Sequence, residues 1–338
     1  MKHVFSVGIM LLWITTLTAQ KTSEQRLLPF YSNGYYGYMD EKGATVIQLT
    51  YKYADEFYEG CAMVQVGDVY GFINTSGSYI VTPQYSRVQR FSHGYASVRV
   101  GDHITGIYGF IDKKGRYLIQ PKYENAGTFS NGFASVKING KYGYIDIHGK
   151  VVIEPQFGDV YEFSLPLSPA MTGDGSKKWG FIDKNGNFVI KPQFDRARRF
   201  FEGLAAVRVG DEATGSWGYI DMKGNWVIPT QFEQADEFHE GFAPVKSDMK
   251  WGYINKKGAI VLKLQFDEAR RFSEGLAAVR VGDKDSGKWG YINTKGEMVI
   301  PLQFSSAYEF LRGLARVHIL TPSRFSSSYV TKDGKVLR

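Results

Sequence analysis

The chain has 338 residues, of which 43% are hydrophobic and 22% are charged, and its formal net charge is +7. These fractions are typical of a folded protein and exclude a disordered chain. Basic and acidic residues are interleaved along the whole sequence, so we expect no nucleic-acid partner, whereas contact with anionic envelope glycans is permitted but not required.

The first twenty residues, MKHVFSVGIMLLWITTLTAQ, are ordered like a secretory signal peptide. Lys2 and His3 form a short basic region, and the apolar stretch that follows is too short to span a bilayer comfortably. We therefore expect cleavage after residue 19 or 20, a periplasmic or cell-surface location, and no membrane insertion after cleavage. An uncleaved anchor is the alternative. Cys61 is the only cysteine, which excludes intramolecular disulfides.

A repeat fills the remainder of the chain, residues 27–338, after a short segment at 21–26. A glycine preceded by Tyr or Trp recurs every 34 to 38 residues, at Gly37, Gly71, Gly109, Gly143, Gly180, Gly218, Gly252 and Gly290. A ninth, degenerate copy reads SYVTKDGKVLR and has Ser328 in place of the glycine. Such a period indicates a repeat architecture and leaves no room for a second domain.

Each repeat predicts three short strands, which in one copy span residues 204–209, 217–221 and 225–228. Asp221 and Gly224 illustrate a recurring D-x-x-G turn, predicted to be a type I turn with a left-handed glycine and a bulge. We interpret its acidic residue as a turn former, not a catalytic group. The third strand is aliphatic on both faces, as at Val189 and Ile190, so we expect it to be covered on both sides.

Connectors such as KPQFDRARRFFEG join the repeats. Their aromatic residues recur at a fixed phase, which favours a role in the core over a ligand cage. Their charged pairs alternate between ADEF and ARRF. These pairs could be read as carboxylates for glycoside hydrolysis or as arginine clusters for anions. We favour a third interpretation, in which equivalent positions of stacked repeats form a ladder of ion pairs.

The combined pattern [WY]-G-[FY]-[IM]-[DN]-x-x-G, followed by P-x-[FY] and F-x-E-G-x-A-x-V, resembles the WG-repeat family. Copies such as KWGFIDKNG and SWGYIDMKG carry the resemblance, with Tyr replacing Trp in the first four copies. The resemblance implies arrays of β-hairpins, often on exported bacterial proteins, and it brings no catalytic residues with it.

The predicted fold is all-β, a tandem array of eight to nine three-stranded β-meanders. Every copy is complete, since the array starts with a first strand and ends after a third, which favours an open solenoid or superhelix. A closed, propeller-like ring is the alternative. A transmembrane barrel needs strands of about 9–11 residues, and these strands are too short.

No residue departs from the repeat pattern in a way that indicates catalysis or the binding of a metal or cofactor. The histidines lack metal-ligand spacing and no phosphate-binding loop is present, so we predict no enzyme activity, metal or cofactor. Binding is assigned instead to the longer hairpin loops and to Trp226, the aromatic residue most out of pattern. The candidate residues are Asp102, His103, Asp211, Glu212, Trp226, Asp283, Asp285 and Lys288. Solvated loops without a partner remain the alternative.

These observations predict an exported, monomeric, non-catalytic repeat scaffold that binds an unidentified protein or envelope glycan. One alternative is a carbohydrate-binding or carbohydrate-active protein that uses exposed aromatic residues as sugar platforms. Another is a purely structural spacer.

Overall fold

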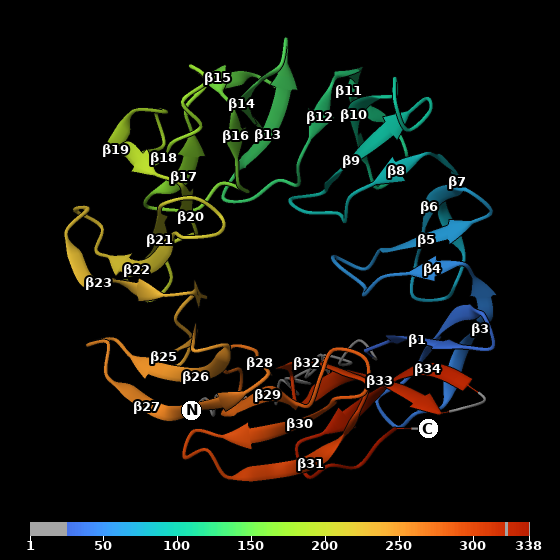
Figure 1. Cartoon of the computed structure of the whole chain (residues 1–338). Helices are drawn as coiled ribbons and strands as arrows, with labels where there is room; N and C mark the ends of the chain where they lie inside the picture. The colour runs from blue at the N-terminus through green and yellow to red at the C-terminus, as the bar shows by residue number, and fades with distance from the viewer. Residues whose placement is uncertain (1–25, 322–323, 338) are drawn as a thin grey trace, which may run out of the picture.

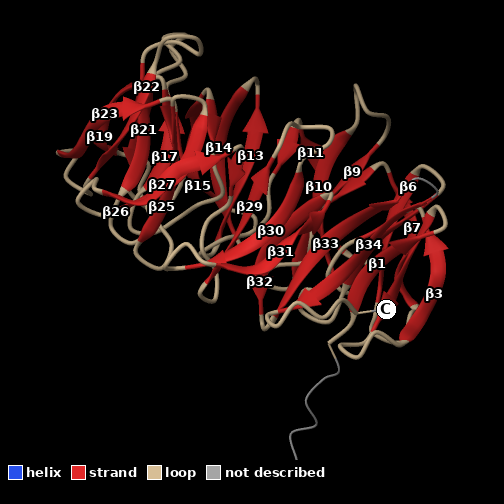
Figure 2. Cartoon of the chain, turned by 60° about the horizontal axis from the view of Figure 1, so that its bottom comes forward, coloured by secondary structure: helices blue, strands red, loops and turns tan. Residues whose placement is uncertain are grey.

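The structure is a computed structural model that describes residues 26–321 and 324–337. The predicted signal peptide at 1–20 lies outside the described residues, which contain no helix long and apolar enough to cross a membrane. Their strands form eight sheets arranged around a ring (Figure 1). Figure 2 shows the sheets standing side by side, with turns gathered at the two faces of the ring. The described chain is therefore an eight-bladed β-propeller in which each sheet is one blade.

Seven blades have four strands each, in sequence order. Their bounds are β4 (Tyr53–Ala54), β5 (Ala62–Val66), β6 (Val69–Ile73), β7 (Tyr79–Tyr85); β8 (Arg87–Val88), β9 (Tyr95–Val100), β10 (Ile107–Asp112), β11 (Tyr117–Tyr123); β12 (Asn125–Ala126), β13 (Phe133–Ile138), β14 (Lys141–Asp146), β15 (Val151–Phe157); β16 (Asp159–Val160), β17 (Ser168–Met171), β18 (Trp179–Ile182), β19 (Phe188–Phe194); β20 (Arg196–Ala197), β21 (Ala205–Val209), β22 (Ser216–Ile220), β23 (Trp226–Phe232); β24 (Gln234–Ala235), β25 (Phe242–Ser247), β26 (Lys250–Asn255), β27 (Ile260–Phe266); β28 (Glu268–Ala269), β29 (Leu276–Val281), β30 (Lys288–Asn293) and β31 (Met298–Phe304).

The eighth blade, called here the closure sheet, joins the two ends of the described chain. Its order is β3-β2-β1-β34-β33-β32. The bounds are β1 (Leu28–Ser32), β2 (Tyr35–Met39), β3 (Thr45–Tyr51), β32 (Ser306–Leu311), β33 (Leu314–Thr321) and β34 (Arg324–Thr331). Strand β1 runs antiparallel to β34, with Tyr31 opposite Ser327. The predicted open solenoid is therefore wrong. The last copy replaces its third strand with a single bridge between Val330 and Val336, which leaves part of the β34 edge available to β1.

The prediction of three-stranded units is also wrong, because each connector contributes a further strand, which has two residues in the seven four-stranded blades and six in β32. In β20, Ala197 pairs with Val207 of β21. The chain passes almost directly from the third strand of one blade into this short strand of the next, since β19 ends at Phe194 and β20 begins at Arg196. The short strands lie toward the inside of the ring and the third strands toward the outside (Figure 1).

The glycine of each WG pair is required by a close approach between two strands. A Cβ atom on Gly218 would lie 2.6 Å from the backbone oxygen of Ile228 in the third strand, where the register of β22 and β23 shifts. The other seven WG glycines meet the same obstacle, at 2.4 to 2.6 Å. Any side chain there would push the outer strand away from the blade.

The recurring aromatic residues pack in the cores between strands and connectors, as the sequence predicts. Phe91, Phe129 and Phe238 of the connectors are buried. The Tyr of W-G-Y is buried as well, and the Tyr253 hydroxyl donates a 2.7 Å hydrogen bond to the backbone oxygen of Arg270. The equivalent bonds run from Tyr38 to Asp55, Tyr144 to Tyr161, Tyr219 to Asp236, and Tyr291 to Tyr308. These bonds tie the middle of each blade to the connector that carries the short inner strand of the next blade.

The D-x-x-G turns have the predicted geometry. Gly224 has a φ of +86°, and the Asp221 carboxylate accepts the backbone N–H groups of Lys223 and Asn225 at 2.8 and 2.9 Å. The prediction that the third strand is covered on both sides is wrong. Val227 is 42% exposed whereas Ile228 is 2% exposed, because the third strand is the outer strand of its blade.

Candidate functional site

Beside the short inner strands, five successive blades carry a ladder of alternating charges. It is formed by Glu162, Arg199, Glu237, Arg271 and Glu309, and we call it the inner-wall ladder. The N–O distances along it are 3.9, 3.7, 3.2 and 3.6 Å. Each member precedes the connector aromatic of its repeat. The ladder confirms the interpretation of the ADEF and ARRF segments as ion pairs between neighbouring repeats.

The first arginine of each ARRF segment has a different role. The Arg198 guanidinium lies 5.3 Å from the centre of the Trp217 ring and 3.3 Å from the Asp236 carboxylate. Arg270 covers Trp289 in the same way, at 5.1 Å. These arginines therefore shield the Trp side chains of the WG pairs, and their charges are already engaged within the ring.

Two titratable side chains along this wall are partly withdrawn from water. Burial raises the pKa of Glu237, and the neighbouring Arg199 and Arg271 oppose that shift. Burial and the charge of Arg271 together lower the pKa of His239. His239 is therefore favoured in its neutral form near pH 7.

A second recurring contact, called here the blade clasp, uses the Glu of F-x-E-G. The Glu59 carboxylate accepts the backbone N–H of Gly94 at 3.0 Å and lies 3.2 Å from the Lys113 ammonium, both on the next blade. The same clasp joins Glu202 to Gly241 and Lys256, and Glu274 to Gly313 and Lys332. The Glu240 carboxylate makes the corresponding contact with a glycine, accepting the backbone N–H of Gly275 at 2.9 Å. The motif glutamate thus ties one blade to its neighbour.

Two adjoining cavities lie at the ring closure and share Arg26, Glu56, Tyr58 and Leu311. The first, called the closure cavity, has a volume of about 490 Å³. Its lining is completed by Leu27, Phe57, Glu59, Gly60, Thr75 and Arg312. The second, of about 410 Å³, extends along the inner wall to residues that include His239, Arg271, Tyr308, Glu309 and Arg316.

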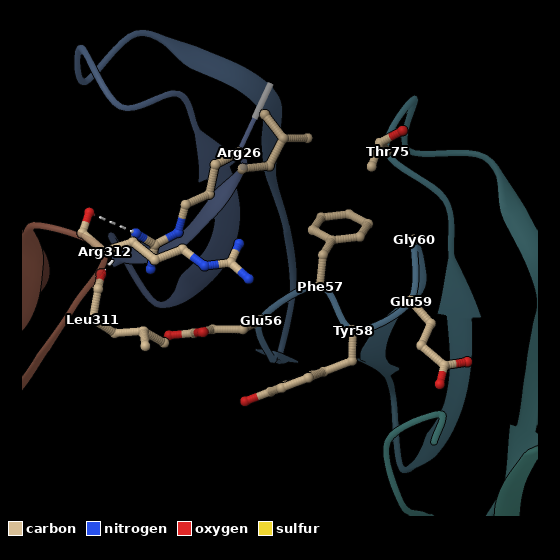
Figure 3. Close-up of a pocket in the computed structure, with 10 residues that line it drawn as sticks. Arg26, Glu56, Phe57, Tyr58, Glu59, Gly60, Thr75, Leu311 and Arg312 are labelled. Atoms are coloured by element: carbon tan, nitrogen blue, oxygen red, sulfur yellow. Dashed lines mark hydrogen bonds between the residues drawn. The ribbon is translucent and has the colours of Figure 1, made fainter. Parts of the chain in front are cut away.

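Arginine side chains define one side of the closure cavity. The Arg26 guanidinium donates a 2.8 Å hydrogen bond to the backbone oxygen of Leu311, which joins the two ends of the described chain. Figure 3 shows Arg26 and Arg312 on one side of the cavity and Gly60 and Thr75 on the other. The aromatic side chains of Phe57 and Tyr58 lie between them (Figure 3). This arrangement suits non-covalent binding of a polar segment.

Comparison with protein families identifies the repeat. The model of the family described as WG containing repeat matches residues 36–70, 70–102, 108–142, 142–167, 179–212, 217–251, 251–284 and 289–318. The chain belongs to the WG-repeat family. Among curated proteins, none matches this WG-repeat sequence.

Solved structures resemble the WG-repeat ring in fold alone. Dipeptidyl peptidase 4 of Porphyromonas gingivalis is 10% identical with a TM-score of 0.57, and the match covers 84% of this chain and 58% of that one. Hsv2p of Kluyveromyces lactis is 12% identical with a TM-score of 0.43, over 70% and 90% of the two chains. The β-propeller domain of the Trilobed protease from Pyrococcus furiosus is 12% identical with a TM-score of 0.42, over 75% and 98%.

The sequence-predicted loop residues of this WG-repeat protein are not brought together. They belong to the hairpins β9–β10, β21–β22 and β29–β30, on three blades that are not neighbours. In each loop the first carboxylate accepts a backbone N–H from within the same loop. Asp102 accepts that of Thr105, Asp211 that of Thr214, and Asp283 that of Ser286. The other predicted loop residues, His103, Glu212, Asp285 and Lys288, lie in or beside the same three hairpins. The loops do not form one continuous strip.

Trp226 lies apart from these loops, on the outer strand β23. It is 44% exposed, and its ring meets Phe194 edge-on at 6.0 Å. The two aromatic residues line a hollow of about 440 Å³ together with Pro229. This is a local aromatic surface and not part of the ring closure.

Sequence reasoning missed Arg26, Gly60, Thr75 and Arg312. A signal was present, because Arg312 stands where four other repeats have the Glu of F-x-E-G, and Thr75 stands where four other repeats have a turn Lys. The meaning of these departures depends on the clasp, which joins residues that are far apart in sequence and becomes visible only once the blades are placed.

Proposed function

We propose that this WG-repeat protein is an exported, non-catalytic scaffold that binds a protein partner at the ring closure. The observation that carries the proposal is the pair of adjoining cavities that share Arg26, Glu56, Tyr58 and Leu311. Concave sites lined by a few polar groups and aromatic side chains are the usual places for recognition.

The distribution of charge supports this location. Along the inner-wall ladder and in the clasps, repeated charges pair with neighbouring blades. At the closure the repeat is interrupted and side chains that depart from it face a cavity. Specificity for one partner has to come from such non-repeated residues, because repeated ones present the same chemistry on several blades.

Export is part of the proposal and rests on the order of residues 1–20. The protein is expected to act as a monomer in the periplasm or at the cell surface. Amino-terminal sequencing of the purified protein should begin at residue 20 or 21. An intact Met1 on protein recovered from the cytoplasm would contradict export.

A site-specific photo-crosslinker tests the binding site. Placed at Leu311, which is 50% exposed and lines both cavities, it should capture one discrete partner from intact cells. Ile104 is the matched control, because it is 80% exposed in the β9–β10 hairpin, away from the closure. Equal products from both positions would contradict binding at the closure. No product from either would favour the spacer.

A second candidate, carbohydrate binding, is favoured by the aromatic hollow at Trp226. An exposed Trp beside Phe194 offers a flat apolar face on which a sugar ring can stack. Pull-down with envelope polysaccharide, comparing the parent chain with Trp226→Ala, tests this function. Retention that depends on Trp226 without released sugar supports binding, released sugar indicates an enzyme, and no retention removes the candidate.

A further inference from the structure

The ring closure carries an altered version of the blade clasp. In the complete clasps, a Glu on one blade meets a Gly N–H and a Lys ammonium on the next. The equivalent positions across the closure are Arg312, Gly60 and Thr75, and all three line the closure cavity. At this position the acceptor has been replaced by a donor, so Arg312 cannot complete the clasp with Gly60 and Thr75.

Three further junctions also lack the glutamate. His93, Asn131 and Leu165 occupy its position there. Asn131 makes a different contact with the next blade, donating from Nδ2 to the backbone oxygen of Phe163 at 2.9 Å. Arg312 alone among the four replacements carries a permanent positive charge, and its guanidinium is exposed at a cavity.

Several donors line the closure cavity from opposite sides. Among the described residues, the Gly60 N–H has no hydrogen-bond partner and the Arg312 guanidinium has no ion-pair partner. Arg26 directs one guanidinium nitrogen at the backbone oxygen of Leu311, which leaves its other N–H groups available. The Thr75 hydroxyl is exposed on the opposite side of the cavity (Figure 3).

The charge balance of the closure cavity favours an anion. Arg26 and Arg312 are cationic, whereas Glu59 is already held by Lys113 and Gly94 in the clasp on its other side. Glu56 is the one further acidic residue of the lining. A planar carboxylate can accept the paired N–H groups of a guanidinium. In the complete clasps a carboxylate already accepts the N–H of the equivalent glycine.

We propose that the closure cavity binds a carboxylate of the protein partner, which supplies the acceptor that Arg312 has replaced and so ties the closure sheet to the next blade. This inference rests on the proposed function and names the chemistry of its site. The carboxylate can come from an Asp or Glu side chain or from a chain terminus, and the two sources are distinguished by the probes.

The test is titration of the full chain with three short peptides, followed by NMR or calorimetry at low ionic strength. The probes are N-acetylated, C-amidated Gly-Gly-Glu-Gly-Gly, its Gln counterpart, and N-acetylated Gly-Gly-Gly-Gly with a free carboxylate. We expect the Glu peptide to bind about tenfold more tightly than the Gln peptide, the gain of one charge-assisted hydrogen-bonding group. Preference for the free terminus over the Glu peptide would assign the carboxylate to a chain end and also supports the proposal.

Three variants locate the site. Arg312→Ala should remove the preference for Glu over Gln, whereas Arg87→Ala, an exposed arginine away from the closure, should leave it unchanged. The double variant Arg312→Glu with Thr75→Lys rebuilds the clasp, so it should fold, resist denaturant better than the parent and lose peptide binding. Equal binding of Glu and Gln peptides to the parent chain would overturn the proposal.

The chain's own Glu24 offers a competing carboxylate two residues before Arg26. Peptide binding that appears only after Glu24→Gln would overturn a partner carboxylate and assign the cavity to the amino-terminal segment. The crosslinking experiment distinguishes failure of the carboxylate site from failure of the proposed function. If Leu311 captures a partner but the chain binds the Glu and Gln peptides equally, this inference alone is contradicted. If Leu311 captures no specific partner, the proposed function is contradicted.

Discussion

The backbone N–H of Tyr31 donates a 2.8 Å hydrogen bond to the hydroxyl of Ser327, across 296 positions of sequence. These residues form the paired position of β1 and β34, so the ring is closed by very little strand pairing. The Arg26 bond to Leu311 adds a second link nearby. A small apolar cluster that includes Leu28, Tyr329 and Leu337 packs at the same closure.

We predict that Arg26→Ala combined with Ser327→Ala lowers the free energy of unfolding by about 2 kcal/mol, since each lost hydrogen bond contributes about 1 kcal/mol. Denaturant titration measures the loss, with Arg87→Ala as the control. An unchanged unfolding midpoint in the double variant would mean that apolar packing alone holds the closure.

The parent chain should be compact in solution, with a radius of gyration of about 20 Å by small-angle scattering.

Much of a single blade could be predicted from the sequence. The D-x-x-G turns, the connector aromatics and the ion ladder recur at a fixed phase, and local chemistry decides each of them. The Asp221 carboxylate, for example, binds N–H groups within its own turn. Such features depend on a few neighbouring residues or on the equivalent residue of the next repeat.

The ring and its closure could not be predicted in the same way. The short strand β20 consists of Arg196 and Ala197 and lies in a polar connector. Two residues are too few to show the alternation of apolar and polar side chains that indicates a strand. Closure depends on how small rotations between blades add up over the whole chain, and on the contact between Tyr31 and Ser327. Neither these rotations nor this contact can be inferred from the residue pattern of one repeat. The closure cavity follows from that contact, so its residues were missed as well.

We predict that Gly218→Ala is severely destabilising, because its Cβ would meet the Ile228 oxygen at 2.6 Å. The expected loss in the free energy of unfolding is more than about 3 kcal/mol, in the range of the strongest single-residue effects. Gly203→Ala is the control, since Gly203 has a φ of +88° but open space around a new Cβ. There the backbone cost alone should be about 1–2 kcal/mol. Equal losses at the two positions would contradict the steric explanation.

We predict that Tyr253→Phe lowers the free energy of unfolding by about 1–2 kcal/mol, because the part-buried backbone oxygen of Arg270 loses its 2.7 Å partner. The change should leave the fold intact, since Phe72, Phe110 and Phe181 occupy the same position in three other blades. Denaturant titration measures the stability, and near-ultraviolet circular dichroism checks that the aromatic core is retained. No loss would show that the connector is held by packing alone.

The blade clasp predicts a specific dependence of stability on pH. Burial alone would raise the pKa of Glu274, but the Lys332 hydrogen bond and the backbone N–H of Gly313 outweigh it and hold the pKa below its usual range. A carboxylate whose pKa is lowered by folding stabilises the fold above its unfolded pKa of about 4.3, and the stabilisation is lost as the pH falls through the folded pKa.

Glu274→Gln should therefore cost about 1 kcal/mol at pH 7, where the charged clasp is intact. The difference from the parent should shrink below pH 4, measured by denaturant titration across the range. Glu41→Gln, an exposed turn residue outside any clasp, should show no such trend. A difference that stays constant down to pH 3 would mean that the charge of Glu274 does not hold the blades together.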